Sequence, residues 1–164
     1  VVPHLPSPNG PLPGAYRAGL WYDPRPKETH SGGTRTDDVG FYLSFDQMLL
    51  RENADDAQGL GVFARYGYAD AKVASVECFW SVGCQYLGLI PTRDADVLGF
   101  GVAQGTLVKA AGFTKPQETV FELYYNAAVL PWLSITPSFQ YVLNPGGDGT
   151  PDAVVFGVRL QISL

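Results

Sequence analysis

Hydrophobic and polar residues alternate along most of this chain with a period of two. The alternation is clearest near the C-terminus, where apolar residues occupy every second position from Val154 to Leu164 and Gly157, Arg159, Gln161 and Ser163 lie between them. Successive side chains of a β-strand point to opposite faces of the sheet. The segment is therefore predicted to be a strand with one apolar and one polar face.

Seven further segments show the same pattern, so the chain is predicted to contain eight strands. Leu133–Tyr141 is the most regular of them, although Pro137 is poorly suited to a central strand of a soluble sheet. The others are Ala15–Asp23, Val39–Arg51, Leu60–Asp70, Phe79–Ile90, Val97–Val108 and Glu118–Leu130. Soluble strands average about five or six residues, whereas a tilted strand that crosses a membrane needs about nine to eleven. The predicted lengths favour the membrane.

The connections between these strands also indicate a membrane barrel. Longer ones are expected at Pro24–Asp38, Ala71–Cys78, Lys109–Gln117 and Asn144–Asp152, and shorter ones at Glu52–Gly59, Pro91–Asp96 and Pro131–Trp132. Outer-membrane barrels alternate short periplasmic turns with longer external loops and carry aromatic girdles at both interfaces. Aromatic residues gather near the predicted strand ends: Trp21, Tyr22, Tyr66, Tyr68, Trp132 and Tyr141.

The predicted fold is thus all-β, an antiparallel transmembrane β-barrel that forms one domain over residues 1–164. Residues 1–14 are expected to be a Pro-rich lead-in and residues 15–164 to hold the eight membrane-spanning strands. The lead-in has neither the charged nor the apolar region of a signal peptide, which suggests a mature, processed or truncated chain.

Composition supports the membrane interpretation and excludes other classes of protein. Hydrophobic residues make up 46% of the 164 residues and charged residues only 16%, against about 25% in an ordinary soluble domain. A net charge of −5 argues against a nucleic-acid partner. The longest uncharged stretch, residues 123–147, is interrupted by Pro131, Pro137 and Pro145 and is not a spanning helix.

The two cysteines, Cys78 and Cys84, leave two alternatives open. On one extended strand they would be roughly 20 Å apart, too far for a disulfide. If Cys78 instead lies in a loop, a local disulfide becomes feasible and would suit a cell-surface compartment. Neither arrangement is a metal signature.

The sequence contains no motif that indicates an enzyme. His4 lies in the lead-in, and His30 beside Ser31 in a long loop is best interpreted as solvated. Gly99-Phe100-Gly101 lacks the third glycine of a dinucleotide-binding loop, and Asp94 and Asp96 fit a charged turn better than a cation site. We expect no catalytic residue, no metal and no cofactor.

The polar faces of the strands supply the candidate binding residues. A charge near the middle of the lipid face costs about 2–4 kcal/mol, so charged strand residues should point to the barrel interior. Mixed arginines, carboxylates and aromatic rings can bind a sugar, but the same residue types also fill the interior of small closed barrels. Both alternatives stay open for this set, which is Arg17, Trp21, Tyr42, Ser44, Asp46, Arg65, Glu118, Glu122, Tyr124, Gln140 and Arg159.

The last third of the chain resembles the carbohydrate-selective outer-membrane porins of the OprB type. The matching elements are Glu118–Tyr125, then Leu130–Pro137 with its Pro-Trp-Leu motif, then Gln140–Gly147 with Gln-Tyr and Asn-Pro-Gly-Gly, and finally Gly157–Leu160. Weaker similarities occur at residues 40–42, 62–67 and 87–94. The terminal Leu164 departs from the aromatic residue with which outer-membrane proteins commonly end.

The resemblance implies a sixteen-stranded channel in the bacterial outer membrane, through which monosaccharides and other small carbohydrates diffuse passively. This chain would then supply about half of the barrel, with sugars, outer-membrane lipid and the missing N-terminal half of the same barrel as partners. One alternative is an autonomous eight-stranded barrel with a side-chain-filled interior and no pore. Another is a soluble lipocalin-type binding protein, whose outer surface would be polar.

Overall fold

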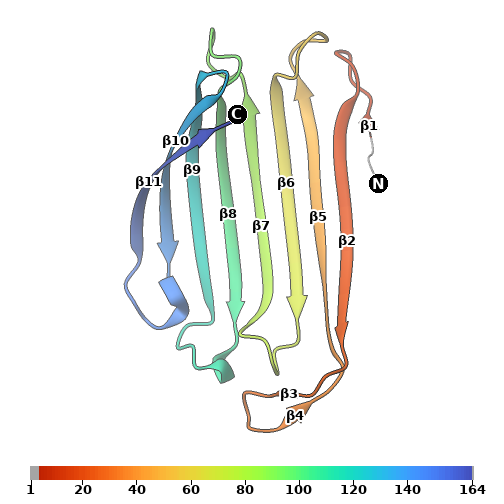
Figure 1. The fold of residues 1–164 in the computed structure, drawn as a ribbon, viewed down its shortest axis with the longest axis vertical. Coiled ribbons are helices and arrows are strands. Elements are labelled where there is room, and N and C mark those ends of the chain that lie inside the picture. Colours follow the sequence, from red (N-terminus) through yellow and green to blue (C-terminus); the bar gives the residue numbers. More distant parts are fainter. Residues whose placement is uncertain (1–3, 164) are drawn as a thin grey trace.

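The computed structural model describes residues 4–163, which form one antiparallel β-sheet with a small hairpin at one end. The strand order of the sheet, β1-β2-β5-β6-β7-β8-β9-β10-β11, follows the sequence, and β3 and β4 form the separate hairpin (Figure 1). The all-β antiparallel prediction is confirmed. Leu164, the last apolar position of the predicted C-terminal strand, lies outside the described residues, as does the start of the lead-in at residues 1–3.

The eight predicted strands correspond to the eight long strands of the sheet. These are β2 (Leu12–Asp23), β5 (Asp38–Arg51), β6 (Gly59–Ala69), β7 (Val76–Leu87), β8 (Val97–Leu107), β9 (Gln117–Leu130), β10 (Leu133–Leu143) and β11 (Ala153–Ile162). The short elements are β1 (His4–Leu5), β3 (Lys27–Glu28), β4 (Thr34–Arg35) and two single 3₁₀ turns, η1 (Lys109–Ala111) and η2 (Pro145–Gly147).

Most boundaries agree with the sequence prediction within two residues, and the larger differences, of three residues, occur on β2 and β7. Strand β2 begins at Leu12, three residues before the expected Ala15, because the lead-in folds back and pairs His4 with Pro13 and Leu5 with Leu12. Strand β7 runs from Val76 to Leu87 where Phe79–Ile90 was predicted. A shift of register at its start, where Cys78 follows Val76 in the pairing with β8, marks a bulge that the alternation did not reveal.

The sheet is open in the part of the chain that the structure describes. Strand β11 pairs with β10, and at the other edge β2 pairs with β5 and β1. No pairing between β2 and β11 occurs within residues 4–163, so the eight long strands do not close on one another there. Among the described residues, no helix has the length and apolar character needed to span a membrane.

The connections lie at two ends of the sheet, which we call the loop end and the turn end. The loop end carries residues 24–37, 70–75, 108–116 and 144–152, and the turn end carries 6–11, 52–58, 88–96 and 131–132. The predicted alternation of long and short connections is only partly correct. The turn-end segment 88–96 is as long as 108–116 at the loop end, and 70–75 is shorter than 52–58.

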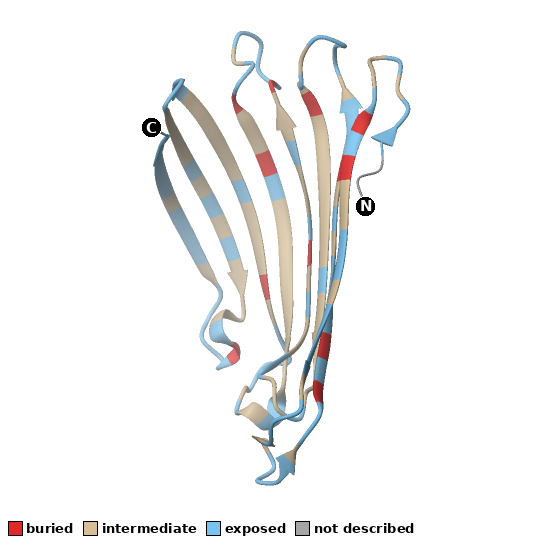
Figure 2. Cartoon of the chain, turned by 45° about the vertical axis from the view of Figure 1, so that its right-hand side comes forward, coloured by how far each residue is buried: buried red, intermediate tan, exposed pale blue. Residues whose placement is uncertain are grey.

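The sheet is a single curved layer without a conventional hydrophobic core (Figure 2). Among the described residues, Leu12 is the one hydrophobic side chain that is buried. Large apolar side chains are instead exposed, such as Leu20 at 79% and Phe156 at 78%. A soluble protein rarely exposes so many neighbouring apolar residues, whereas a sheet that separates lipid from water needs an exposed apolar face.

Both cysteines lie on strand β7 and are free thiols. They are six positions apart on one extended strand, so the geometry excludes the local disulfide that a loop position for Cys78 would have allowed. The hydroxyl of Tyr66 lies 3.5 Å from the sulfur of Cys78, and both side chains belong to the same face of the sheet.

Candidate functional site: the polar face of the sheet

The strand register divides the sheet into two chemically different faces. Arg17 pairs with Ser44 and Ser44 with Arg65, while Asp46 pairs with Phe63 on the next strand. Nearer the β11 edge of the sheet, Glu122 pairs with Gln140. Followed strand by strand, the register places all ten predicted lining residues, and Ser44, on one face, which we call the polar face: Arg17, Trp21, Tyr42, Asp46, Arg65, Glu118, Glu122, Tyr124, Gln140 and Arg159.

The opposite face is apolar over most of its area. Its exposed side chains include Leu43, Val82, Phe100, Leu123 and Phe156. Four of the six aromatic residues predicted for the interfacial girdles lie on this face in the half of their strands nearer the loop end, namely Tyr22, Tyr66, Tyr68 and Tyr141. Trp21 instead belongs to the polar face, and Trp132 lies in the two-residue turn between β9 and β10.

Three charged residues meet on the polar face of β2, β5 and β6. The carboxylate of Asp46 accepts a hydrogen bond from Arg17 Nη1 at 3.1 Å and another from Arg65 Nη2 at 2.6 Å. Arg65 Nη1 also donates to the backbone carbonyls of Phe45 and Ala64, at 2.6 and 3.0 Å. Three acceptors therefore fix the Arg65 guanidinium, which holds a positive group at a defined place on the wall.

Trp21 and Tyr42 lie flat against the sheet at the loop end of the same three strands. Each ring covers a glycine of the neighbouring strand, because a Cβ atom at Gly40 would fall 1.8 Å from the indole of Trp21, and one at Gly19 would fall 2.2 Å from the ring of Tyr42. Both rings are exposed, at 40% and 47% of the residue surface. The glycines thus create flat aromatic surfaces on the polar face.

A second polar group lies across β9, β10 and β11. Glu122 faces Gln140 in the register, and Arg159 faces Thr136. Asn126 Nδ2 donates to Thr136 Oγ1 at 2.7 Å, which links β9 to β10 beside Arg159. Tyr124 lies over Gly99, and its hydroxyl donates to Gln85 Oε1 at 3.4 Å.

Glu118 lies on the polar face but at its loop end. Its carboxylate accepts a hydrogen bond from the backbone N–H of Gly146, in the 3₁₀ turn η2 of the loop 144–152. This contact holds the Asn-Pro-Gly-Gly segment against the start of β9. Glu118 therefore anchors a loop, a role that period-two alternation could not distinguish from pore lining.

The two polar groups are separated by a strip of small residues that the sequence analysis did not single out as functional. On β8 four successive polar-face positions are Gly99, Gly101, Ala103 and Gly105, and on β7 the polar-face positions include Ser81 and Gly83. The signal was present in the sequence, since Phe100, Val102 and Gln104 alternate with those small residues. The rings of Phe63 and Tyr124 lie over Gly83 and Gly99 of this strip, between the arginine-rich and the glutamate-bearing walls.

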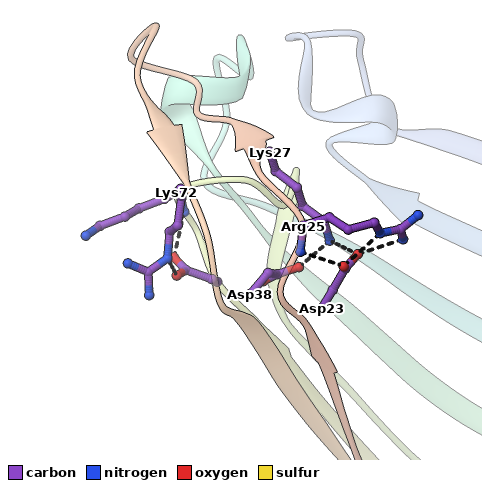
Figure 3. A network of polar contacts seen from close by, with 7 residues as sticks. Asp23, Arg25, Lys27, Asp38 and Lys72 are labelled. Carbon is purple, nitrogen blue, oxygen red and sulfur yellow. Dashed lines mark hydrogen bonds and ion pairs between the residues drawn. The ribbon is translucent and has the colours of Figure 1, made fainter.

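Ion pairs close the base of the β3–β4 hairpin at the loop end (Figure 3). Asp23 binds Arg25 at 2.8 Å and Lys27 at 3.3 Å, and Lys27 also donates to Asp38 at 2.6 Å. The hydrogen bond to Asp38 holds the pKa of Lys27 above its usual value. Arg35 pairs with Asp70 at 2.5 Å, which ties the hairpin to the next loop.

His30 and Ser31 do not form a catalytic pair. The Nε2 atom of His30 lies 3.0 Å from the backbone oxygen of Ala74, and Ser31 Oγ lies 3.1 Å from Thr29 Oγ1. Each side chain thus has a structural partner within the loops. Within residues 4–163, no three His, Cys, Asp or Glu side chains come together in a way that could hold a metal ion.

Asp96 is a buried ion-pair partner at the turn end, with 3% of its surface exposed. It accepts hydrogen bonds from Arg93 Nε at 2.7 Å, from the backbone N–H of Ala128 at 2.9 Å and from the Tyr125 hydroxyl. Burial opposes ionisation of Asp96, but these hydrogen bonds outweigh it and lower the pKa of Asp96 below its usual value. The prediction of a charged turn is consistent with this geometry, since Arg93 neutralises the carboxylate that a cation would need.

Comparison with known proteins agrees with this two-faced sheet. Residues 4–164 match the family described as "Carbohydrate-selective porin, OprB family". The chain belongs to the OprB family. Porin B of Pseudomonas aeruginosa is 27% identical over 186 aligned residues, which cover 92% of this chain and 41% of Porin B. The putative porin QuiX of Acinetobacter baylyi is 24% identical and is likewise covered over 41% of its length.

The fold agrees with that of a solved OprB porin. The high-pH structure of Pseudomonas putida OprB superposes with a TM-score of 0.86 at 26% identity, over 98% of this chain and 46% of that one. The chain thus spans less than half the length of the relatives it matches. As a member of the OprB family, it is an outer-membrane β-protein and not an enzyme.

Proposed function

We propose that this chain forms about half of the wall of a sixteen-stranded outer-membrane barrel through which small neutral sugars diffuse. Its eight long strands would cross the bilayer, with the apolar face against lipid and the polar face towards an aqueous lumen. The remaining strands would pair with the free edges of β2 and β11. No cofactor and no chemical step are involved, because transport is passive.

The observation that carries this proposal is the segregation of side chains between the two faces. Arg17, Asp46 and Arg65 share a face with Glu122 and Gln140 although they lie on five different strands. A lipid-facing position would cost each arginine about 2–4 kcal/mol near the midplane, and each carboxylate somewhat less. The same positions facing water cost nothing and supply donors and acceptors to a permeating solute.

Selectivity for sugars would come from hydrogen bonding combined with flat apolar surfaces. The Arg17–Asp46–Arg65 group offers fixed donors and acceptors for hydroxyl groups, and the exposed rings of Trp21 and Tyr42 offer surfaces for the C–H faces of a sugar. Binding must stay weak, because a conducting site has to release its solute. The arginines and carboxylates on opposite walls would also orient a polar solute across the lumen.

The open sheet favours the larger barrel over an autonomous eight-stranded one. An eight-stranded barrel would need β2 to pair with β11. Within residues 4–163 these two strands lie at opposite edges of the sheet, where β2 pairs only with the two-residue β1 beyond β5.

The proposal is tested by sugar entry into liposomes that contain the complete barrel, in which further strands pair with β2 and β11. Liposome swelling should be faster with isotonic D-glucose than with the disaccharide sucrose, and exchange of Arg65 for Ala should slow the entry of glucose. Protein-free liposomes of the same lipid give the background. Glucose entry at the background rate, or entry that is indifferent to Arg65→Ala, would contradict the proposed lumen and its lining respectively.

A further inference from the structure

A hollow of about 550 Å³ opens on the sheet at the turn end of β2, β5, β6 and β7. The side chains that line it from the polar face include Asp46, Met48, Phe63, Arg65 and Gln85. Its volume lies within the range of about 300–1,000 Å³ that is typical of small-molecule sites. It lies next to the Arg17–Asp46–Arg65 group, on the side facing the turn end.

Two glycines at the start of β6 explain why this space is empty. Gly59 has a φ of +143°, and a Cβ atom there would fall 2.0 Å from the backbone oxygen of Leu50, so the close approach of β5 and β6 requires glycine. Gly61 has ordinary φ, and a Cβ atom there would meet its nearest neighbour, Gln85 Cγ, only at 3.8 Å. The space above Gly61 is therefore open without any requirement of the backbone.

The polar groups around the hollow are held in place before any solute arrives. Arg65 uses three N–H groups on Phe45, Ala64 and Asp46, which leaves two of the five donors of a guanidinium. Each carboxylate oxygen of Asp46 accepts one guanidinium. The exposed amide of Gln85, whose oxygen accepts a hydrogen bond from Tyr124, adds an NH₂ donor on the opposite wall.

An aromatic ring completes the hollow. Phe63 packs across β7, since a Cβ atom at Gly83 would fall 2.5 Å from its ring, and the guanidinium carbon of Arg65 lies 5.3 Å from the ring centroid. The hollow thus combines a flat apolar surface with fixed donors and acceptors, supplied by Arg65 and by the one carboxylate that it shares with Arg17. This combination suits a ring compound that carries several hydroxyl groups, because the ring can lie on Phe63 while its hydroxyls pair with the fixed donors and acceptors.

We propose that this hollow is a monosaccharide-binding subsite on the wall at the turn end of the sheet, with Asp46, Arg65 and Gln85 as hydrogen-bonding groups and Phe63 as the apolar surface. The inference rests on the proposed function, because it assumes that sugars reach the polar face. It goes further than the proposed function because it names one position on the wall at which a sugar binds.

The test compares two valine substitutions on the same face of the same strand. Gly61→Val fills the hollow, whereas Gly67→Val adds the same side chain six residues away, where a Cβ atom has its nearest neighbour, the backbone oxygen of Phe41, at 4.0 Å. Binding of radiolabelled D-glucose to the detergent-solubilised full chain is measured by equilibrium dialysis, which does not depend on transport. We expect Gly61→Val to weaken glucose binding at least about tenfold, or about 1.4 kcal/mol, and Gly67→Val to leave it unchanged.

Gln85→Ala provides a second variant that removes an amide without adding bulk. It should weaken glucose binding severalfold, and it decides the matter if circular dichroism shows that Gly61→Val does not fold. Glucose binding that survives both Gly61→Val and Gln85→Ala overturns the subsite. So does the absence of glucose binding to the unaltered protein.

The two proposals fail in distinguishable ways. If liposomes pass glucose while dialysis detects no binding, the subsite is wrong and the transport function stands. If dialysis detects binding that Gly61→Val abolishes while liposomes pass no glucose, the subsite stands and the transport function is wrong.

Discussion

The indole of Trp21 lies so close to Gly40 of the neighbouring strand that any Cβ atom at position 40 would fall 1.8 Å from the ring. This contact joins β2 to β5 on the polar face, two residues from the loop end of both strands in the register. A similar contact, Tyr42 over Gly19, lies beside it. The two glycines determine where two of the exposed aromatic rings of the polar face lie.

Gly40→Ala should therefore displace the Trp21 ring from the sheet and destabilise the fold by about 1–3 kcal/mol, the usual cost of forcing extra atoms into a packed site. Urea unfolding in detergent micelles measures the stability, and tryptophan fluorescence reports the surroundings of the indole. Gly67→Ala is the matched control, since a Cβ atom there has its nearest neighbour at 4.0 Å. Equal stability of the two variants would show that Trp21 does not rest on Gly40.

A second prediction concerns the buried carboxylate of Asp96. Asp96→Asn removes the charge that Arg93 and the Ala128 N–H bind, and should lower the free energy of unfolding by about 2–3 kcal/mol. Asp94→Asn, two residues away at an exposed position, should change it by less than about 0.5 kcal/mol. Heat-induced unfolding followed by gel mobility distinguishes the variants, and equal unfolding temperatures would contradict the structural role of Asp96.

The lowered pKa of Asp96 gives this role a pH dependence. A carboxyl whose pKa is lower in the folded state than in the unfolded chain stabilises the fold above the unfolded pKa, which is about 3.9 for Asp. Its contribution is lost as the pH falls below that value through the folded-state pKa. The stability difference between the unaltered protein and Asp96→Asn should thus be constant from about pH 5 upwards and shrink below about pH 4. A difference that grows on acidification would contradict this assignment.

The division between the two faces is tested by adjacent residues. Leu123 lies on the apolar face and Glu122 on the polar face of β9. Leu123 lies near the middle of β9, so Leu123→Arg should destabilise the bilayer-inserted protein by about 2–4 kcal/mol, whereas Glu122→Arg should cost much less. Folding yield in lipid vesicles, titrated with urea, measures both. Equal costs, or a larger cost for Glu122→Arg, would reverse the assignment of the faces.

The strands and their faces could be predicted from sequence because both depend on local alternation. Arg17 and Arg65, 48 positions apart in the sequence, were assigned to the same face by alternation alone, and the register agrees. The loop-end role of Glu118 could not be predicted, because it depends on a hydrogen bond to Gly146, which is distant in the sequence. The connection lengths were also misjudged where the strand ends depend on pairing with a neighbour, as at β7.

The hollow at the turn end was missed for a related reason. Nothing in the sequence distinguishes Gly61 from the other strand glycines. Its place in the hollow is evident only from the register, which puts Met48 and Gln85 on either side of it. The position of Arg65 likewise depends on carbonyl groups of two strands, which alternation does not reveal. The face on which a strand residue lies could therefore be predicted from the alternation of polar and apolar residues. Contacts between strands could not, because they depend on the register of the sheet.

Whether the polar face borders an aqueous path for sugars is tested by ion current through a planar lipid bilayer that contains the complete barrel, in which further strands pair with β2 and β11. We expect stepwise conductance that falls as D-glucose is added, because a sugar in the lumen blocks ion flow. Absence of conductance, or conductance that glucose does not alter, would contradict the proposed aqueous path.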